Sequence, residues 1–382
     1  MTGSGQCNLT HAGEIREFLR HYGSHGRFLK PALYSWTNRD LCGYFETRGV
    51  PLETEPGGKV FPKSRSSRDI LNVLLRQCDE SGVEIRCGEP VTRVEKKGDL
   101  FLVVTSRATR LADQLVVATG GKSFPGTGSS GDGYRIAAAL GHTVVPQAPA
   151  LTPVSIRNFP FAGLAGISFP DLSFSIWRGT KKVCACRGDV LITHTGLSGP
   201  GILDNSRSML PGDGIRLSFT GDMNREKCSA DLLKRIQANG SQRISALLLP
   251  YNLPLRIVAR ILTISGIDPD LSCAHLTAGQ RNRLAESLTS LSLTIDDLGD
   301  FSVAMVTRGG VALSEVNHKT MESRLVKNLY FAGEVLDIDG DTGGYNLQAA
   351  FSTGRLAGTS TRAKGVQVVP QTGRKSRNTF VV

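Results

Sequence analysis

The pattern of apolar and polar positions divides the first part of the chain into a helix and a hairpin. Ser66 and Asp69 form a capping-box pattern before an apolar stripe, which predicts a helix that ends at Gly82. Residues 91–94 and 100–105 flank a Lys-Gly-Asp turn and predict a β-hairpin. Both segments have the lengths and turn residues that are typical of a folded α/β unit.

An apolar run over residues 114–119 ends in two glycines, Gly120 and Gly121. A continuous apolar run of this length is typical of a strand that is buried on both faces and feeds a tight turn. Two short helices are predicted at residues 11–19 and 132–140. The first region of the chain therefore contains helices, a hairpin and one buried strand.

The middle of the chain has a different pattern. Three short runs are β-like: 172–177, 190–193 and 215–220. From residue 229 to residue 298 the apolar spacing is helical, and Thr277 with Gln280 forms a second capping-box pattern. This stretch reads as an insertion of strands followed by helices.

The third region is again a strand followed by a helix, with no internal repeat of the first. Residues 329–332 predict a strand, a glycine-rich loop follows, and an amphipathic helix is predicted over 345–356. We therefore expect an α/β fold in which one split domain carries an inserted domain. The expected ranges are 1–153 with 301–365 for the split domain, 154–300 for the insert (β-rich over 154–228, helical over 229–300), and 366–382 for a basic tail.

Charge is unevenly distributed along the 382 residues. The chain has 45 basic and 34 acidic residues and a formal net charge of +11. No acidic residue follows Asp341, and the same stretch contains six basic residues: Arg355, Arg362, Lys364, Arg374, Lys375 and Arg377. We interpret the excess as a solvated tail, which does not favour a nucleic-acid partner; a contact with a polyanion is the alternative.

Cysteine spacing and hydropathy exclude several classes of protein. The eight cysteines form no C-x-x-C pair, and no histidine lies at zinc-finger spacing from Cys184 and Cys186, so no metal site is expected. The N-terminus has no apolar signal segment, and the longest oily stretch, 247–267, is interrupted by prolines and arginines. We expect a cytoplasmic protein that does not enter a membrane.

Residues 126–131 match the dinucleotide-binding pattern G-x-G-x-x-G. Six residues separate this pattern from the strand end at Thr119, so the turn is not tight. The acidic residue expected about 20 positions later is missing, because no Asp or Glu occurs between Asp132 and Asp171. We interpret the segment as a glycine-rich or compact loop rather than as a fingerprint.

Three other segments are more informative together. Residues 118–121 read A-T-G-G at a strand end, and residues 331–337 place Glu334 at the end of another strand. Residues 342–348 then open a helix after a glycine pair, and a helix start favours anionic or electron-rich groups. The third segment is S-G-Q-C-N-L-T at 4–10.

These blocks resemble the NAD(P)/FAD-dependent oxidoreductases of the bile-acid-operon and aminoacetone-oxidase-like flavoprotein group, in the glutathione-reductase-like superfamily. The matching blocks occur in order over nearly the whole chain: 4–10, K-V-F-P-K-S at 59–64, A-T-G-G-K-S-F-P-G-T-G-S-S-G-D-G-Y at 118–134, A-L-T-P at 150–153, T-H-T-G-L-S-G-P at 193–200, G-G-V at 309–311, M-E-S at 321–323, F-A-G-E-V-L-D at 331–337 and T-G-G-Y-N-L-Q at 342–348.

The resemblance implies an FAD cofactor and a Rossmann-like FAD domain. It implies that Glu334 binds the ribityl hydroxyls, and that backbone N–H groups near Gly344, Asn346 and Leu347 face the pyrimidine end of the flavin. A helix start there would stabilise negative charge on the reduced ring. The full set of cofactor-binding candidates is Gly5, Cys7, Asn8, Thr119, Gly120, Gly121, Glu334, Gly343, Gly344, Asn346 and Leu347.

The sequence also departs from the pattern that it resembles. In that family a β-α-β unit with the dinucleotide fingerprint precedes the first block, and Gln6 stands here where the family has arginine. On this basis we expect a truncated Rossmann-like domain with weakened FAD affinity.

The reaction is less defined than the cofactor. The expected function is hydride transfer at flavin N5 with a small-molecule substrate that the sequence leaves open, and with NAD(P)H as a candidate electron donor. His194, Cys7 and Tyr345 are weak catalytic candidates. The alternative is a degenerate flavoprotein without activity that acts as a basic interaction protein. The oligomeric state is left open.

Overall fold

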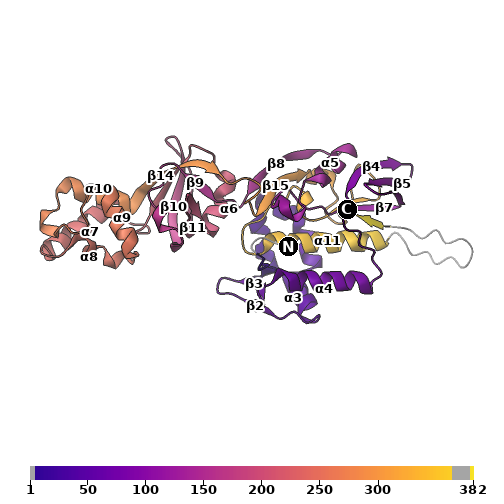
Figure 1. Ribbon diagram of the computed structural model, residues 1–382, viewed down its shortest axis with the longest axis horizontal. Helices are drawn as coiled ribbons and strands as arrows, with labels where there is room; N and C mark the ends of the chain where they lie inside the picture. Colours follow the sequence, from indigo (N-terminus) through magenta and orange to yellow (C-terminus); the bar gives the residue numbers. More distant parts are fainter. Residues whose placement is uncertain (1–4, 364–378) are drawn as a thin grey trace, which may run out of the picture. The chain divides into compact units, whose positions relative to one another are not determined.

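The computed structural model describes residues 5–363 and 379–382, and these residues form two compact units (Figure 1). One unit is discontinuous and contains residues 1–150 and 304–382, whereas the other contains residues 151–303. The chain therefore leaves the first unit once, completes the second, and returns.

The discontinuous unit is built around a small parallel sheet. Strand β7 (Gln114–Val117) lies between β16 (Leu329–Phe331) and β17 (Thr379–Val381), and both neighbours are parallel to it. All four residues of β7 are buried, which is why the segment reads as a continuous apolar run. The apolar side chains of β7 and β16 share a core with helices of the same unit.

The remaining strands of this unit form three further small sheets in the order β1-β3-β2, β4-β5-β6 and β15-β8. They are β1 (Thr10–His11), β2 (Leu52–Thr54), β3 (Lys59–Pro62), β4 (Val91–Lys97), β5 (Leu100–Thr105), β6 (Thr109–Ala112), β8 (Val144–Ala150) and β15 (Val306–Val311). In β5 buried and half-buried positions alternate along the strand, so one face of the hairpin covers the core.

The helices of this unit pack in two apolar cores, of which only one contains the parallel sheet. The α-helices are α1 (Ile15–Phe18), α2 (Gly26–Ser35), α3 (Asn38–Glu46), α4 (Ser67–Glu80), α5 (Asp132–Ala139) and α11 (Tyr345–Ala363). Short 3-10 turns are η1 (Leu19–His25), η2 (Pro125–Thr127), η7 (Leu313–Glu315) and η8 (Gly333–Val335). Helix α11 packs against α2 and contributes Tyr345, Ala349 and Ala357 to the core.

The second unit is a closed six-stranded barrel joined to a helical cluster. The barrel order is β10-β11-β12-β9-β14-β13, with all pairs antiparallel. Its strands are β9 (Val154–Ile156), β10 (Ser168–Arg178), β11 (Lys181–Ile192), β12 (Gly196–Ser198), β13 (Gly214–Ser218) and β14 (Leu291–Leu298). Its helices are η3 (Ala162–Leu164), α6 (Pro200–Asn205), η4 (Ser206–Ser208), α7 (Arg225–Ala238), α8 (Ile244–Leu247), η5 (Leu249–Tyr251), α9 (Leu255–Ile264), η6 (Cys273–His275) and α10 (Ala278–Ser290).

The helical stretch expected over 229–300 ends earlier than the sequence pattern indicated. Residues Leu291–Leu298 form strand β14, which closes the barrel between β13 and β9. Its buried residues, Leu291, Leu293 and Ile295, alternate with exposed ones. This two-residue period is the signal that separates the strand from the preceding helix α10.

Three other local expectations differ from the structure. His11 lies in strand β1 rather than in a helix, because Thr10 and His11 pair with β3. Helix α4 begins after Ser66, as expected, but the Ser66 hydroxyl accepts from Arg68 N–H, while Asp69 accepts from Ser64. The basic tail expected over 366–382 lies outside the described residues except for its end, and that end forms strand β17 instead of a solvated tail.

No helix among the described residues is by itself long and apolar enough to cross a membrane. Two consecutive segments, Ile244–Tyr251 and Leu255–Ile264, reach the required length and hydropathy only together, and the chain bends by 119° between them. Most apolar side chains of these segments belong to the core of the second unit.

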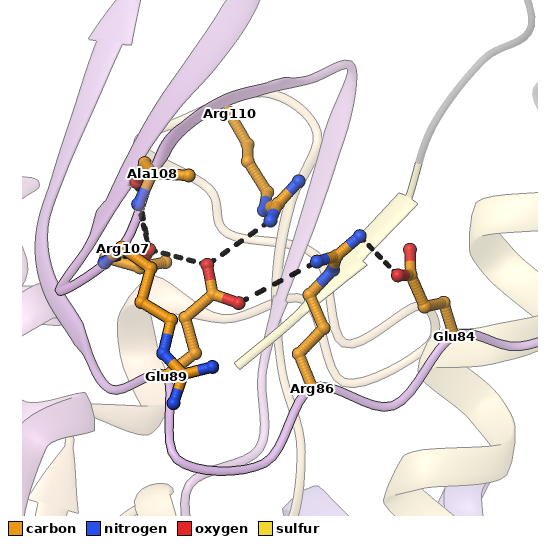
Figure 2. Close-up of polar contacts among 7 residues, drawn as sticks. Glu84, Arg86, Glu89, Arg107, Ala108 and Arg110 are labelled. Carbon is orange, nitrogen blue, oxygen red and sulfur yellow. Dashed lines mark hydrogen bonds and ion pairs between the residues drawn. The ribbon is translucent and has the colours of Figure 1, made fainter.

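A buried carboxylate ties the loop before β4 to the β5–β6 hairpin. Figure 2 shows Glu89 between Arg86 and Arg110, at 3.8 and 3.3 Å. Thr105 donates its hydroxyl proton to Glu89 Oε1 at 2.7 Å and accepts from Ala108 N–H at 2.9 Å. The hydrogen bond from Thr105, helped by the two arginines, holds the pKa of Glu89 below its usual range.

This network predicts a pH-dependent contribution to stability. A lowered pKa means that the stabilisation is present above the usual glutamate pKa and is lost as the pH falls through the lowered value. We expect Glu89→Gln to lower the free energy of unfolding at pH 7, with a loss that shrinks below about pH 4. Urea denaturation at pH 7 and below about pH 4 measures the free energy of unfolding of each variant. Glu84→Gln is the control, because Glu84 is 68% exposed and its only ion-pair partner among the described residues is Arg86. An equal loss in both variants would contradict the prediction.

Candidate functional site

Two parallel strands of the discontinuous unit end side by side. Val117 is the register partner of Phe331, and Ala332 N–H donates to Val117 C=O at 3.0 Å. The A-T-G-G turn, residues 118–121, follows β7, and Gly333 with Glu334 follows β16. The carboxyl ends of parallel strands are where open α/β sheets bind their ligands.

Glu334 is held next to the A-T-G-G turn. Its Oε1 accepts a hydrogen bond from Thr307 N–H at 2.7 Å. A Cβ atom on Gly121 would lie 2.6 Å from the same oxygen and 2.5 Å from Thr307 Oγ1. Glycine at position 121 therefore makes room for the carboxylate. Burial raises the pKa of Glu334 above its usual range, and the hydrogen bond from Thr307 partly opposes this rise.

Thr307 connects the turn to the acid. Its Oγ1 accepts from the backbone N–H groups of Lys122 and Ser123, at 2.8 and 3.1 Å, while its own N–H reaches Glu334. Thr307 is fully buried on β15. Sequence reasoning did not single out this residue, since nothing in its local pattern shows that β15 runs past the turn.

The segment S-G-Q-C-N-L-T meets the start of α11. With its amide oriented to match its neighbours, Asn8 accepts from Gly344 N–H at 3.0 Å. Gly344 has a φ of +97°, and a Cβ atom there would lie 2.4 Å from Thr10 C=O. Thr10 donates its hydroxyl proton to Gln348 Oε1 at 2.6 Å. Two segments 338 residues apart are thus joined by backbone contact that only glycine allows.

The remaining cofactor candidates support these contacts. Asn346 accepts from Gly340 N–H at 2.7 Å and donates to Gly340 C=O at 2.9 Å, which fixes the loop before α11. Gly343 has a φ of +118°. Cys7 is buried in an apolar cluster with Leu9, and Leu347 packs against it.

Gly5 and Thr119 complete the set. Gly5 has a φ of +85°, and its C=O accepts from Ser67 N–H at 2.7 Å, at the start of α4. Thr119 is contacted by α5, because a Cβ atom on Gly133 would lie 2.1 Å from its hydroxyl. Gly120 has a φ of +75°. The cofactor candidates therefore form two groups, one around Glu334 and one around Gly344, both in the same unit.

The glycine-rich segment 126–131 is a loop between β7 and α5. It contains the turn η2, and Gly128 and Gly131 have φ values of +99° and +80°. Helix α5 begins directly after it but is separated from β7 by the whole of residues 118–131. The arrangement differs from a fingerprint, in which a tight turn joins strand and helix.

The three catalytic candidates lie in different surroundings. Cys7 is a buried core residue, and His194 is exposed in the turn between β11 and β12 of the second unit. Tyr345 is the first residue of α11 and is buried, and two imidazoles stack on its ring. Its ring is 3.9 Å from the His21 ring and 5.3 Å from the His11 ring, both nearly parallel to it.

Beside Tyr345 the structure places a histidine–aspartate pair, His21 and Asp341. His21 Nδ1 lies 3.0 Å from Asp341 Oδ2, and Asp341 N–H donates to His21 C=O at 2.9 Å. The pair therefore orients an imidazole beside Tyr345. No sequence signal could have found it, because the two residues are 320 positions apart and neither belongs to a recognisable motif.

The two groups have the features of a site for a large ligand with hydroxyl groups and an electron-rich ring. Glu334 provides a carboxylate at a strand end, where sugar-type hydroxyls are bound in α/β folds. The 19-residue helix α11 begins at the glycine pair, and the positive end of its dipole favours an electron-rich group. The crowding around Gly121 and Gly344 leaves no room for side chains at either position.

Three known proteins are similar to this chain over most of its length. The chain is 30% identical to the 3-dehydro-bile acid delta(4,6)-reductase of Clostridium scindens over 367 residues, which covers 94% of this chain and 88% of that protein. It is 32% identical to the ribosomal RNA dihydrouridine synthase of Escherichia coli, covering 92% of this chain and 86% of the relative. The corresponding synthase of Haemophilus influenzae is 30% identical, with the same coverage.

The family and one solved structure complete the comparison. The FrdA chain of E. coli quinol fumarate reductase matches this chain with a TM-score of 0.46 and 12% identity, and this chain covers 65% of its length. A likeness at that level shows nothing about function. The family model described as "HI0933-like protein Rossmann domain" matches residues 1–360. The protein therefore belongs to the HI0933-like Rossmann-domain family.

Proposed function

We propose that this protein is an FAD-dependent oxidoreductase that reduces a carbon–carbon double bond in its substrate. The observation that carries the proposal is the position of Glu334, a half-buried carboxylate held by Thr307 beside a glycine turn at adjacent ends of parallel strands. Membership of a Rossmann-domain family supports a nucleotide-type cofactor. FAD, when bound, supplies a ring that accepts and donates hydride at N5.

The residues of the two groups would hold FAD in distinct ways. Glu334 would accept hydrogen bonds from ribityl hydroxyls, with Gly121 and Thr307 fixing its position. The start of α11, at Gly344 to Leu347, would face the pyrimidine end of the ring and stabilise negative charge there. In this arrangement Cys7 and Asn8 support the start of α11, and Gly5 supports the start of α4, rather than taking part in chemistry.

The names of the relatives suggest the type of bond that is reduced. A delta(4,6)-reductase and a dihydrouridine synthase both act, by name, on a carbon–carbon double bond. Their molecules differ greatly in size, so the shared feature is the double bond next to a carbonyl group. We propose the same class of bond for this protein. NAD(P)H is the proposed electron donor.

Reduction of such a bond needs a proton as well as a hydride, and we propose that His21 supplies it with Asp341 as its orienting partner. We expect His21→Asn to lower the rate of substrate reduction by about 10²–10⁴-fold. The rate of flavin reduction by NADPH, measured without substrate, should stay within about twofold, because that half-reaction needs no donated proton. Equal loss in both half-reactions would contradict a proton-donating role and indicate a structural one.

Titration with FAD tests the cofactor directly. Adding purified apoprotein to FAD should quench flavin fluorescence to a one-to-one end point, and mass spectrometry should identify FAD rather than FMN in the complex. Glu334→Gln should weaken binding about tenfold or more, because a charged hydrogen-bond acceptor is lost. An unchanged affinity in this variant would remove Glu334 from the cofactor site.

A further inference from the structure

A pocket lies on the discontinuous unit, two to three helical turns along α11 from the glycine pair. Its volume is about 250 Å³, and its lining residues include Trp36, Tyr44, Leu74, Phe351 and Arg355. They come from the end of α2 and from α3, α4 and α11. None of the lining residues is among those assigned to FAD, although several share an apolar cluster with Cys7 and Leu347.

The aromatic wall of the pocket is fixed in place. Trp36 C=O accepts from Ser352 Oγ at 2.8 Å and from Gln348 Nε2 at 3.1 Å, and both of these α11 side chains are fully buried. The Trp36 and Tyr44 rings lie 6.0 Å apart in an edge-to-face arrangement. Trp36 is half-buried, so the part of its ring that Arg355 and Tyr44 leave uncovered is open to a planar ligand.

The charge at the pocket is positive, and its guanidinium lies over the aromatic wall. The Arg355 guanidinium lies 4.8 Å from the centre of the Trp36 ring. Within residues 5–363 and 379–382 it makes no hydrogen bond or ion pair. Arg48, by contrast, is engaged by Gln77 and by Tyr44 C=O, at 3.0 Å each. None of the residues that line the pocket is acidic.

We propose that this pocket binds a single nucleotide, with its base against Trp36 and its phosphate at Arg355. An aromatic surface next to an arginine matches a base joined to a phosphate, since bases stack on aromatic rings and arginine pairs with phosphate. The volume suits one ring system rather than a whole dinucleotide, which would extend out of the pocket. Gly354 leaves open space beside Arg355, as nothing lies within 4 Å of where its Cβ would be.

The nucleotide has two possible sources, a free dinucleotide electron donor or a strand of RNA substrate. Both sources offer a base joined to a phosphate, and the pocket would hold only one nucleotide of either. This proposal goes beyond the proposed function and does not depend on it, because nucleotide binding here requires neither FAD nor turnover. A negative result for nucleotide binding would therefore not contradict the proposed oxidoreductase function, and a negative result for that function would not contradict nucleotide binding.

Tryptophan fluorescence provides a direct reading of the pocket. The chain has two tryptophans, Trp36 and Trp177, so Trp177→Phe leaves Trp36 as the only reporter. In this background the full chain is titrated with AMP, with NADPH, with UMP and with a single-stranded oligouridine. Quenching by AMP and NADPH but not by the oligonucleotide assigns the pocket to a free donor, whereas preference for the oligonucleotide assigns it to RNA. Both results support nucleotide binding.

Arg355→Gln provides the test of the phosphate contact. We expect it to weaken binding about tenfold or more and to reduce the salt dependence, because one charged contact is lost. The matched control is Arg216→Gln in the chain that retains Trp177, since Arg216 lies 3.9 Å from the Trp177 ring in the second unit; this change should leave nucleotide affinity unaltered. Absence of quenching by all four ligands at millimolar concentration, or an unchanged affinity in Arg355→Gln, overturns the proposal.

Discussion

Replacing Gly121 with alanine should remove most of the protein's capacity to bind FAD. The added Cβ atom would lie 2.5 Å from Thr307 Oγ1 and 2.6 Å from Glu334 Oε1, well inside van der Waals contact. Both side chains must move, and the hydrogen bond from Thr307 N–H to Glu334 would be lost or distorted. We expect a loss of stability of about 1–3 kcal/mol from overpacking and an FAD affinity at least about tenfold weaker.

Gly126→Ala is the matched control for this change. Gly126 lies in the same connection between β7 and α5, and nothing is found within 4 Å of where its Cβ would be. Its FAD affinity, measured by flavin fluorescence, should equal that of the unaltered protein. If Gly121→Ala bound FAD as well as Gly126→Ala does, the carboxylate beside the turn would not be part of the cofactor site.

Gly344→Ala should destabilise the discontinuous unit strongly. Its Cβ atom would meet the Thr10 carbonyl oxygen at 2.4 Å, and backbone cannot move aside as the tip of a side chain can. The φ of +97° adds strain for any residue with a side chain. We expect a loss of about 2–4 kcal/mol in the free energy of unfolding, measured by urea denaturation with Trp36 as the reporter.

Gly358→Ala, in the exposed part of the same helix, should change stability in the opposite direction. No atom lies within 4 Å of its added Cβ, and alanine is favoured over glycine in a helix by about 1 kcal/mol. The contrast separates the special position of Gly344 from a general effect of glycine in α11. A loss of similar size in both variants would mean that the contact with Thr10 contributes little.

Periodicity and turn residues predicted most of the local elements. The hairpin β4–β5, the buried strand β7 and the capping box of α10 appear where the pattern placed them. Each of these signals is local, because a cap or an alternation depends on residues close in sequence. The strand β14 was misread as helix because helical residues precede it, although its own period of two was visible.

The contacts that build the candidate site, unlike these local signals, join residues that are far apart in the sequence. Thr307 with Glu334, Thr10 with Gln348 and His21 with Asp341 each join elements that are distant along the chain. Glycines at 121 and 344 could be recognised as special from their motifs, but the atoms that they make room for could not. Strand β17 was also hidden, since three residues after a basic stretch give too short a pattern to predict a partner for β7.

An anaerobic single-turnover experiment tests the central proposal most directly. Protein reconstituted with FAD is reduced photochemically and then mixed with a ligand that has a double bond conjugated to a carbonyl group, either a 4,6-dien-3-one steroid or a uridine-containing RNA. Our account predicts that the oxidised flavin spectrum returns at a rate that rises with ligand concentration, and that the recovered product has gained two hydrogens across the double bond. A flavin that remains reduced with both ligands, and that is reoxidised only when oxygen is admitted, would contradict it.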